Sequence, residues 1–204
     1  MAIGRPFKRE VAVLRDVLDA DCYISLAKMK THGMTMLSGA VKNNYGLLAG
    51  AQKSWYHLHS EKPEVFAEIL IEMFRLRPPD LVIMDGIIAM EGYGPCSPET
   101  RRVNKVLASD DAVALDAVMA RMAGFGKEDV PYLRLAREWG VGQTDLRAID
   151  IEGDFPATRR LVEISKSCRM IDAAGVVDQD IHGAVLAVRF RDHGIHTGPL
   201  GHIG

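Results

Sequence analysis

The most regular pattern of apolar positions predicts an amphipathic helix between residues 66 and 74. The residues that recur there at helical spacing are Phe66, Ile69, Leu70, Met73 and Phe74. Pro78-Pro79 is expected to end this helix, because proline lacks the amide hydrogen that a helix needs. A continuous apolar run follows at 80–85, and such a run is typical of a buried strand in a parallel sheet.

Helix and strand patterns alternate along the rest of the chain. Strands are predicted at 21–27, 106–109 and 146–151, and helices at 15–19, 34–48, 112–124 and 132–139. Asp110 and Asp111 are of the residue type that begins helices. Nearer the C-terminus we expect a helix at 158–167, a strand at 184–190 and a loosely held end at 194–204. The alternation predicts an α/β fold with a mainly parallel sheet flanked by helices, in which the strands at 22–27, 80–84 and 106–109 are neighbours.

Composition narrows the class of protein without identifying a function. The 204 residues are 48% hydrophobic and 25% charged, the mix of an ordinary globular chain that can bury its own core. A net charge of -2 argues against a nucleic-acid-binding protein, and no apolar run approaches the roughly 20 residues of a membrane helix. Cys22, Cys96 and Cys168 form no CxxC pair. We therefore expect no metal site with cysteine ligands and no iron–sulfur cluster built from this chain, in a protein of the reducing cytoplasm.

Basic residues gather in a segment that has no acidic residue. From Cys22 to Ser60 there is no Asp or Glu, although 27 acidic residues in 204 would place about five there. Strand alternation would put Lys28 and Lys30 on one side, and helical spacing would align Thr35, Ser38 and Lys42. These groups suit a carboxylate or a phosphate; the alternative is that the lysines form an ordinary solvated face.

Carboxylates gather further along the chain, between residues 80 and 116. Asp85 follows a predicted buried strand, and Glu91 lies beside a Gly-Tyr-Gly-Pro turn. Either could act as a general base or bind a divalent cation, or could simply lie on the surface. Asp116 has small helical neighbours and needs a partner if it is buried, for which a lysine of the acid-free segment is the expected candidate.

Several motifs, taken in order, resemble the domain of unknown function 362 family. They are Ala27-Lys-Met-Lys-Thr-His-Gly-Met-Thr35, Ser38-Gly-Ala-Val-Lys-Asn-Asn-Tyr-Gly46, Lys53, His57, Asp85-Gly86, Met90-Glu-Gly-Tyr-Gly-Pro95 and Ala108-Ser-Asp-Asp-Ala-Val-Ala-Leu-Asp116. The resemblance covers about 8–154, which we take as one α/β domain, and leaves 155–204 as a C-terminal extension. It implies a cytosolic protein without an established activity, in a family sometimes fused to ferredoxin-type modules. Members usually carry a further α/β portion before the Lys-x-Lys-Thr-His motif, so this chain is expected to be the later part of a longer, two-lobed protein.

The residues and the resemblance together suggest a soluble protein with a Lys- and His-rich site for an anionic small molecule or cofactor, opposite a carboxylate cluster. The reaction and the cofactor stay unknown. If the protein is an enzyme, His32 would carry protons, Lys42 would act as nucleophile or anion clamp, and Glu91 is the third catalytic candidate. The remaining candidates for binding a ligand or cofactor are Lys28, Lys30, Thr31, Thr35, Asn43, Lys53, His57, Asp85 and Asp116.

Two other functions are compatible with the same residues. One is a non-catalytic binding or redox-partner module that works with a separate ferredoxin-like iron–sulfur protein. The other, weaker one is a racemase-like enzyme, because Gly39-Ala-Val-Lys42 is similar to the segment in which a lysine holds the cofactor of nickel-pincer lactate racemases.

Overall fold

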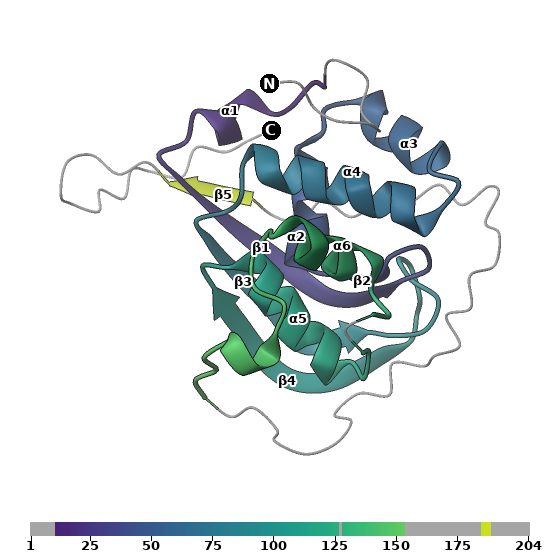
Figure 1. The fold of residues 1–204 in the computed structure, drawn as a ribbon, viewed down its shortest axis with the longest axis vertical. Helices are drawn as coiled ribbons and strands as arrows, with labels where there is room; N and C mark the ends of the chain where they lie inside the picture. Colours follow the sequence, from purple (N-terminus) through teal and green to yellow (C-terminus); the bar gives the residue numbers. More distant parts are fainter. Residues whose placement is uncertain (1–10, 127, 154–184, 189–204) are drawn as a thin grey trace.

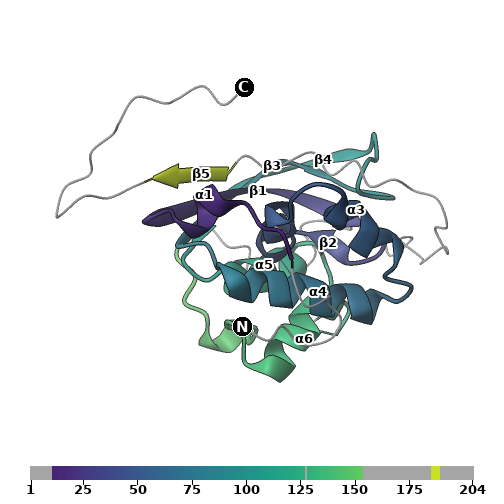
Figure 2. The same cartoon turned by 90° about the horizontal axis from the view of Figure 1, so that it is seen from above.

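A sheet and a layer of helices make up the described part of the chain. The computed structural model describes residues 11–126, 128–153 and 185–188. Helices α4, α5 and α6 lie together on one side of the sheet (Figures 1 and 2). An α/β fold is therefore confirmed.

The sheet is mixed rather than mainly parallel. It contains β1 (Cys22–His32), β2 (Met36–Ser38), β3 (Leu81–Met90) and β4 (Thr100–Ser109) in the order β2-β1-β3-β4, and β5 (Val185–Val188) also pairs with β1. The neighbours β1, β3 and β4 were predicted correctly. Among the described strands, however, only the β1–β3 pair is parallel, and β4 runs antiparallel to β3. The reason is that β4 begins at Thr100, so the link from β3 is too short for the crossover of a dozen or more residues that a parallel pair requires.

The helices are α1 (Arg15–Leu18), α2 (Ala40–Asn43), α3 (Ala51–Leu58), α4 (Pro63–Leu76), α5 (Ala112–Met122) and α6 (Pro131–Trp139), with 3-10 turns η1 (Asn44–Leu47) and η2 (Leu146–Ala148). Asp111 caps α5 as predicted, because its side chain accepts the amides of Val113 and Ala114. The single helix predicted at 34–48 is wrong, since β2, α2 and η1 occupy that range. The strand predicted at 146–151 is also wrong, because the Asp145 side chain accepts the Arg147 amide and begins η2 instead.

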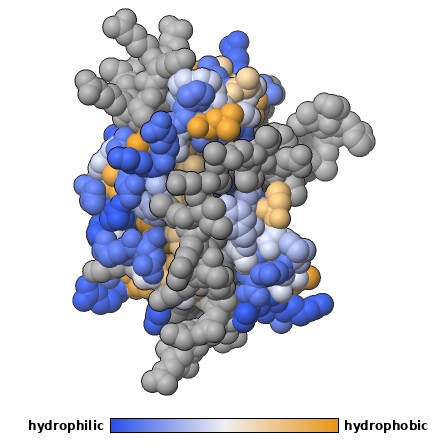
Figure 3. Space-filling view, turned by 90° about the vertical axis from the view of Figure 1, so that its right-hand side faces the viewer, coloured by the Kyte–Doolittle hydropathy of each residue, from blue (hydrophilic) through white to orange (hydrophobic). Residues whose placement is uncertain are grey.

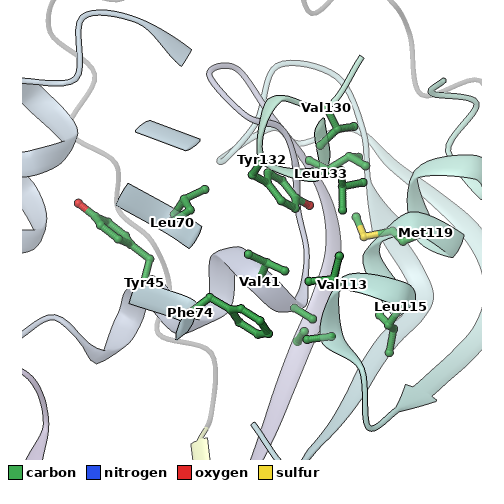
Figure 4. Close-up of a cluster of buried hydrophobic side chains, with 14 of the residues drawn as sticks. Val41, Tyr45, Leu70, Phe74, Val113, Leu115, Met119, Val130, Tyr132 and Leu133 are labelled. Carbon is green, nitrogen blue, oxygen red and sulfur yellow. The ribbon is translucent and has the colours of Figure 1, made fainter. Parts of the chain in front are cut away.

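The core lies where α2, α4, α5 and α6 meet below the sheet. The side chains labelled in Figure 4 belong to this core: Val41, Tyr45, Leu70, Phe74, Val113, Leu115, Met119, Val130, Tyr132 and Leu133. All ten are buried, and they come from segments up to 92 residues apart, from Val41 to Leu133 (133 − 41). Close packing of these side chains holds the short helix α2 against the longer helices. It therefore also holds the other residues of α2 in position.

Some predictions fall outside the described residues. The helix at 158–167 and the glycine-rich end at 194–204 cannot be compared, and the domain boundary at 154/155 stays a prediction. The strand predicted at 184–190 is confirmed over Val185–Val188. Within the described residues, no helix is long and apolar enough to cross a membrane.

Candidate basic and aromatic site at the end of strand β1

The end of β1 is held by the loop that follows β3. Thr31 donates its hydroxyl to the carbonyl of Gly92 at 2.9 Å, and the Gly33 amide donates to the carbonyl of Gly94 at 3.1 Å. Gly94 packs so closely that a Cβ atom there would lie 2.0 Å from the Thr31 carbonyl oxygen. Two of the motifs singled out in the sequence, Lys28–His32 and Glu91–Pro95, are therefore parts of one structural unit.

Four basic side chains of the acid-free segment gather around two aromatic rings close to this unit. Lys42 on α2 and His57 on α3 both lie against Phe66 of α4, with the Lys42 Nζ 6.0 Å and the His57 ring 5.0 Å from the Phe66 ring centre. His32 lies next to His57, with 5.9 Å between ring centres. We call these residues the basic cluster: His32, Lys42, Lys53 and His57, with the rings of Tyr45 and Phe66.

The aromatic pair joins the lysines of the basic cluster. Tyr45 and Phe66 meet edge to face with 5.2 Å between ring centres, and the Lys53 Nζ lies 6.0 Å from the centre of Tyr45. The Tyr45 hydroxyl donates to the backbone carbonyl of Lys53, which fixes the start of α3 next to the ring. Lys42 is only 4% exposed. A cation held over an aromatic face in a desolvated position gains an attraction of about 2 kcal/mol.

His32 is anchored through one nitrogen of its ring. Its Nδ1 accepts the backbone amides of Met34 at 3.1 Å and Thr35 at 3.3 Å, and the side chain is 2% exposed. Thr35 is buried as well, and its hydroxyl donates to the carbonyl of Leu37. Hydrogen bonds of His32 and Thr35 thus hold the turn between β1 and β2.

Asp116 of α5 holds the start of α2. Its two carboxylate oxygens accept the amides of Ala40 at 2.6 Å and Val41 at 3.0 Å, and the Tyr132 hydroxyl of α6 donates at 3.1 Å. The lysine partner expected from the sequence is wrong. The small residues around Asp116 let α5 approach the backbone of α2, so that backbone amides replace a cation. Asp116 is fully buried and is a structural carboxylate.

Burial also changes the acidity of this group. It raises the pKa of Asp116 to about 7, although the two amides and the Tyr132 hydroxyl favour the charged form. Burial beside Asp116 in turn raises the pKa of Tyr132 well above its usual value. Gly39 is required next to the carboxylate, because a Cβ atom there would lie 2.2 Å from an Asp116 oxygen.

Lys28 and Asp85 form a pair on the outer face of the sheet, opposite the helices. They are aligned across β1 and β3, and Lys28 Nζ lies 2.6 Å from an Asp85 oxygen. Their hydrogen bond, helped by the Ile87 amide, lowers the pKa of Asp85. Alternation of exposed Lys28 with buried Ala27 and Met29 confirms that β1 has one covered and one outer side. Lys28 therefore lies on the other side of the sheet from Lys42.

The remaining candidates make local contacts. Glu91 accepts two hydrogen bonds from the Arg101 guanidinium, the shorter at 2.7 Å, across the β3–β4 pair. Asn43 donates its amide to the Ser25 hydroxyl at 2.8 Å and ties α2 to β1. Lys30 alternates with buried Met29 and Thr31 and is aligned with Ser38 of β2. The roles proposed from the sequence for these residues stay proposals.

Sequence reasoning missed the uncharged parts of this region. Phe66 was interpreted only as a core residue of its helix, and Tyr45, Tyr132 and Gly39 were given no role. The one sequence feature that could have pointed to them is their position next to the candidate residues. Tyr45 lies three residues after Lys42, and Gly39 directly precedes the residues whose amides Asp116 binds. Their partners are far away in sequence, so only the fold could identify them.

Other candidate features lie elsewhere or are absent from the described residues. Grooves of about 330 Å³ beside β4 and α5, and of about 280 Å³ beside α5 and α6, contain none of the basic cluster. Among residues 11–126 and 128–153, no group of three or more His, Cys, Asp or Glu could hold a metal ion. Figure 3 shows the side of the molecule next to α3, where hydrophilic residues predominate over small hydrophobic patches.

Comparison with known proteins agrees with the order of the motifs. The chain is 34% identical over 131 residues to a thylakoid-associated protein of Synechocystis, a match that covers 64% of this chain and 41% of the relative. It thus spans about two fifths of that relative's length. No solved structure matches. The family model described as "Domain of unknown function (DUF362)" matches residues 1–121, which include the basic cluster, Asp85, Glu91 and Asp116. The chain therefore belongs to the DUF362 family.

Proposed function

We propose that the basic cluster binds an anionic small molecule, or the anionic part of a cofactor. The observation that carries this proposal is that Lys42, Lys53 and His57 converge on the rings of Tyr45 and Phe66. His32 in turn lies next to His57. All four bases come from a segment of 39 residues, 22–60, in which the sequence has no carboxylate. A ligand with carboxylate or phosphate oxygens complements that charge.

A buried hydroxyl in the same segment supports the proposal. Ser38 is 5% exposed, and its Oγ makes no hydrogen bond to the described residues. Buried hydroxyls nearly always have a partner, so an unsatisfied one points to a group supplied from outside the protein. Ser38 ends β2, directly before the Gly39 and Ala40 stretch that carries Lys42.

The residues proposed for this site differ in what they do. Lys42 and Lys53 would supply charge, and His32 and His57 would supply hydrogen bonds. Thr31, Thr35 and Asn43 would act indirectly, because their side chains bind the backbone or Ser25 and shape the segment. Whether a reaction follows binding is a further question, for which Lys42 is the proposed nucleophile or clamp.

Titration with two simple anions tests this function. Binding of sulfate and succinate to the whole chain is measured by calorimetry, with Lys42→Ala as the site variant and Lys62→Ala as an exposed lysine control. Loss of a charge-assisted hydrogen bond costs about 1.5–3 kcal/mol, so Lys42→Ala should bind roughly 10- to 150-fold more weakly. Lys62→Ala should bind like the parent protein.

Two results would contradict the proposal. One is that neither anion binds the parent protein at millimolar concentration; the other is that Lys42→Ala and Lys62→Ala bind equally well. Native mass spectrometry of the freshly purified chain complements the titration. A retained nickel or pyridinium species would instead favour the racemase-like function.

A second candidate function is a binding or redox-partner module, and the outer face of the sheet favours it. Leu26, Ile83 and Val106 are exposed there by 36%, 36% and 61%, around the Lys28–Asp85 pair. Exposed apolar groups on adjacent strands are typical of a protein-binding surface. Titration with a ferredoxin-type protein, followed by NMR, should broaden signals of these three residues before those of the helices. Uniform or absent broadening would contradict this candidate.

We propose a cytoplasmic setting for either function. The relative's name associates that protein with thylakoids. A cytoplasmic protein that binds a partner at a membrane surface would be consistent with that association. Anionic small molecules and a ferredoxin-like protein are the proposed partners; no nucleic acid or lipid is proposed.

A further inference from the structure

The groove beside α5 and α6 combines an apolar floor with a basic rim. It has a volume of about 280 Å³ and lies between these two helices and the turn η2, away from the basic cluster. Four of its apolar side chains are buried and one is partly buried, and together they form the floor: Ala117, Ala120, Phe125, Leu133 and Leu146. Because none of these side chains can form a hydrogen bond, the floor suits the hydrocarbon part of a ligand.

Three guanidinium groups line the rim of the same groove. Arg121 lies in the last turn of α5, Arg137 in the last turn of α6, and Arg147 in η2. All three side chains are exposed, so a ligand can reach them. Asp145 is the one carboxylate among the described residues that line the groove. The rim is therefore basic, although the whole chain is slightly acidic.

Two of these arginines already have carboxylate partners. Arg137 donates to Glu128 at 2.8 and 3.1 Å, and Arg147 donates to Asp145 at 3.1 and 3.0 Å. These pairs carry no net charge, but a guanidinium has five N–H donors, so each arginine keeps some for a ligand. The guanidinium of Arg121 forms no hydrogen bond or ion pair within the part of the chain that the structure describes.

This balance of charges favours a ligand with a single anionic group. Arg121 supplies one uncompensated positive charge, whereas Asp145 and Glu128 would repel a second negative charge. The parallel N–H groups of a guanidinium match the two oxygens of a carboxylate. A volume of about 280 Å³ equals that of roughly nine waters at about 30 Å³ each, so the hydrocarbon part is no larger than one ring or a short branched chain.

We propose that this groove binds a small apolar monocarboxylate, with the carboxylate on Arg121 and the hydrocarbon on the apolar floor. The site goes beyond the proposed function of the basic cluster and shares no residue with it. Most of its lining, from Phe125 to Arg147, follows residue 121, at which the match to the family model ends. It is a second binding site, built mainly by a part of the chain that the family match does not include.

Three related probes separate the two parts of the groove. Phenylacetate has both the charge and the ring, acetate has the charge alone, and phenylacetamide has the ring without the charge. Each is titrated into the full ¹⁵N-labelled chain and followed by NMR. We expect phenylacetate to bind with a millimolar Kd and to shift the amide signals of Phe125, Leu146 and Arg147. Acetate and phenylacetamide should bind at least about tenfold more weakly, because each lacks one of the two contacts.

Two arginine variants test the anion-binding group. Arg121→Gln removes the charge and should weaken phenylacetate binding at least about tenfold, as expected for the loss of a charge-assisted hydrogen bond. Arg75→Gln is the matched control, because Arg75 is also exposed and in the last turn of a helix, α4, but lies outside the groove. Substitutions at exposed positions seldom affect folding. Leu146→Ala tests the floor, and should weaken binding of phenylacetate but not of acetate.

The outcomes distinguish this site from the basic cluster. If phenylacetate does not bind at millimolar concentration, if phenylacetamide binds as tightly, or if Arg121→Gln and Arg75→Gln bind equally well, the inference is overturned. If Lys42→Ala removes phenylacetate binding and Arg121→Gln does not, the acid occupies the basic cluster, and the inference fails while the proposed function holds. If sulfate and succinate do not bind but phenylacetate binds through Arg121, the proposed function alone fails.

Discussion

Asp116 shows how one buried side chain can determine the identity of a residue far away in sequence. Its carboxylate lies against Gly39, 77 positions earlier (116 − 39), where a Cβ atom would come within 2.2 Å of an oxygen. Gly39→Ala would therefore push α2 away from α5 and break the bonds to Ala40 and Val41. Such overpacking should lower the free energy of unfolding by about 1–3 kcal/mol. Gly46→Ala is the matched control, because nothing lies within 4 Å of its Cβ position, and urea unfolding compares the two.

The raised pKa of Asp116 makes a second prediction at the same residue. Burial gives the folded state a pKa of about 7, above the usual 3.9 of an unfolded Asp, so the folded state binds the proton more tightly. The stabilisation is fully present below pH 3.9 and is lost as the pH rises towards 7, by at most about 1.4 kcal/mol per pH unit. Asp116→Asn should be destabilised, because it loses an acceptor, and should lack this slope. Urea unfolding at pH 5, 6, 7 and 8 would contradict this if the parent and variant curves stay parallel.

At the scale of elements, the segment 34–48 shows what the sequence can and cannot predict. Leu37, Val41, Tyr45 and Leu48 lie near helical spacing, which is why a helix was predicted there, and all four are buried. They nevertheless belong to a strand, a helical turn and a 3-10 turn, or lie just after it. Apolar spacing identifies buried positions, but the break at Gly39 depends on Asp116, which no local pattern reveals. Long helices such as α4, where the pattern is continuous and proline marks the end, were predicted well.

The loop from β3 to β4 is an element whose role can be tested by one small change. Gly94→Ala would put a Cβ atom 2.0 Å from the Thr31 carbonyl oxygen, so the loop would move away from the end of β1. We expect faster hydrogen exchange at the amides of Gly33 and Glu91, which are bonded to Gly94 and Glu99. Gly33→Ala is the matched control, because its Cβ atom would meet nothing closer than 3.6 Å, and it should leave exchange at the Glu91 amide unchanged. Unchanged exchange in Gly94→Ala would show that the loop does not depend on this contact.

At the scale of the whole molecule, the residues predicted to form one anion site lie on two opposite faces of the sheet. The sequence indicated that Lys28 and Lys42 belong to one basic site, whereas Lys28 pairs with Asp85 on the outer face. Alternation along a strand shows which residues share a side of the sheet. It does not show which of the two sides of β1 the helices cover, because both sides repeat every two residues. The antiparallel direction of β4 was missed because only 106–109 was predicted as a strand, which left a link from β3 long enough for a parallel crossover. The charge pattern therefore indicated the basic segment, but only the fold shows that its lysines lie on two faces of the sheet.

This division predicts that two lysines of the same segment act independently. Lys28 pairs with Asp85 on the outer face, where both side chains are about half exposed, and surface pairs of this kind contribute at most about 1 kcal/mol. Lys28→Ala should therefore change the unfolding free energy only slightly and leave sulfate affinity unchanged, while Lys42→Ala weakens that affinity at least tenfold. The double variant should bind like Lys42→Ala, since the two effects come from separate faces. If Lys28→Ala weakens binding as strongly as Lys42→Ala, the ligand spans the edge of the sheet and the two faces form one site.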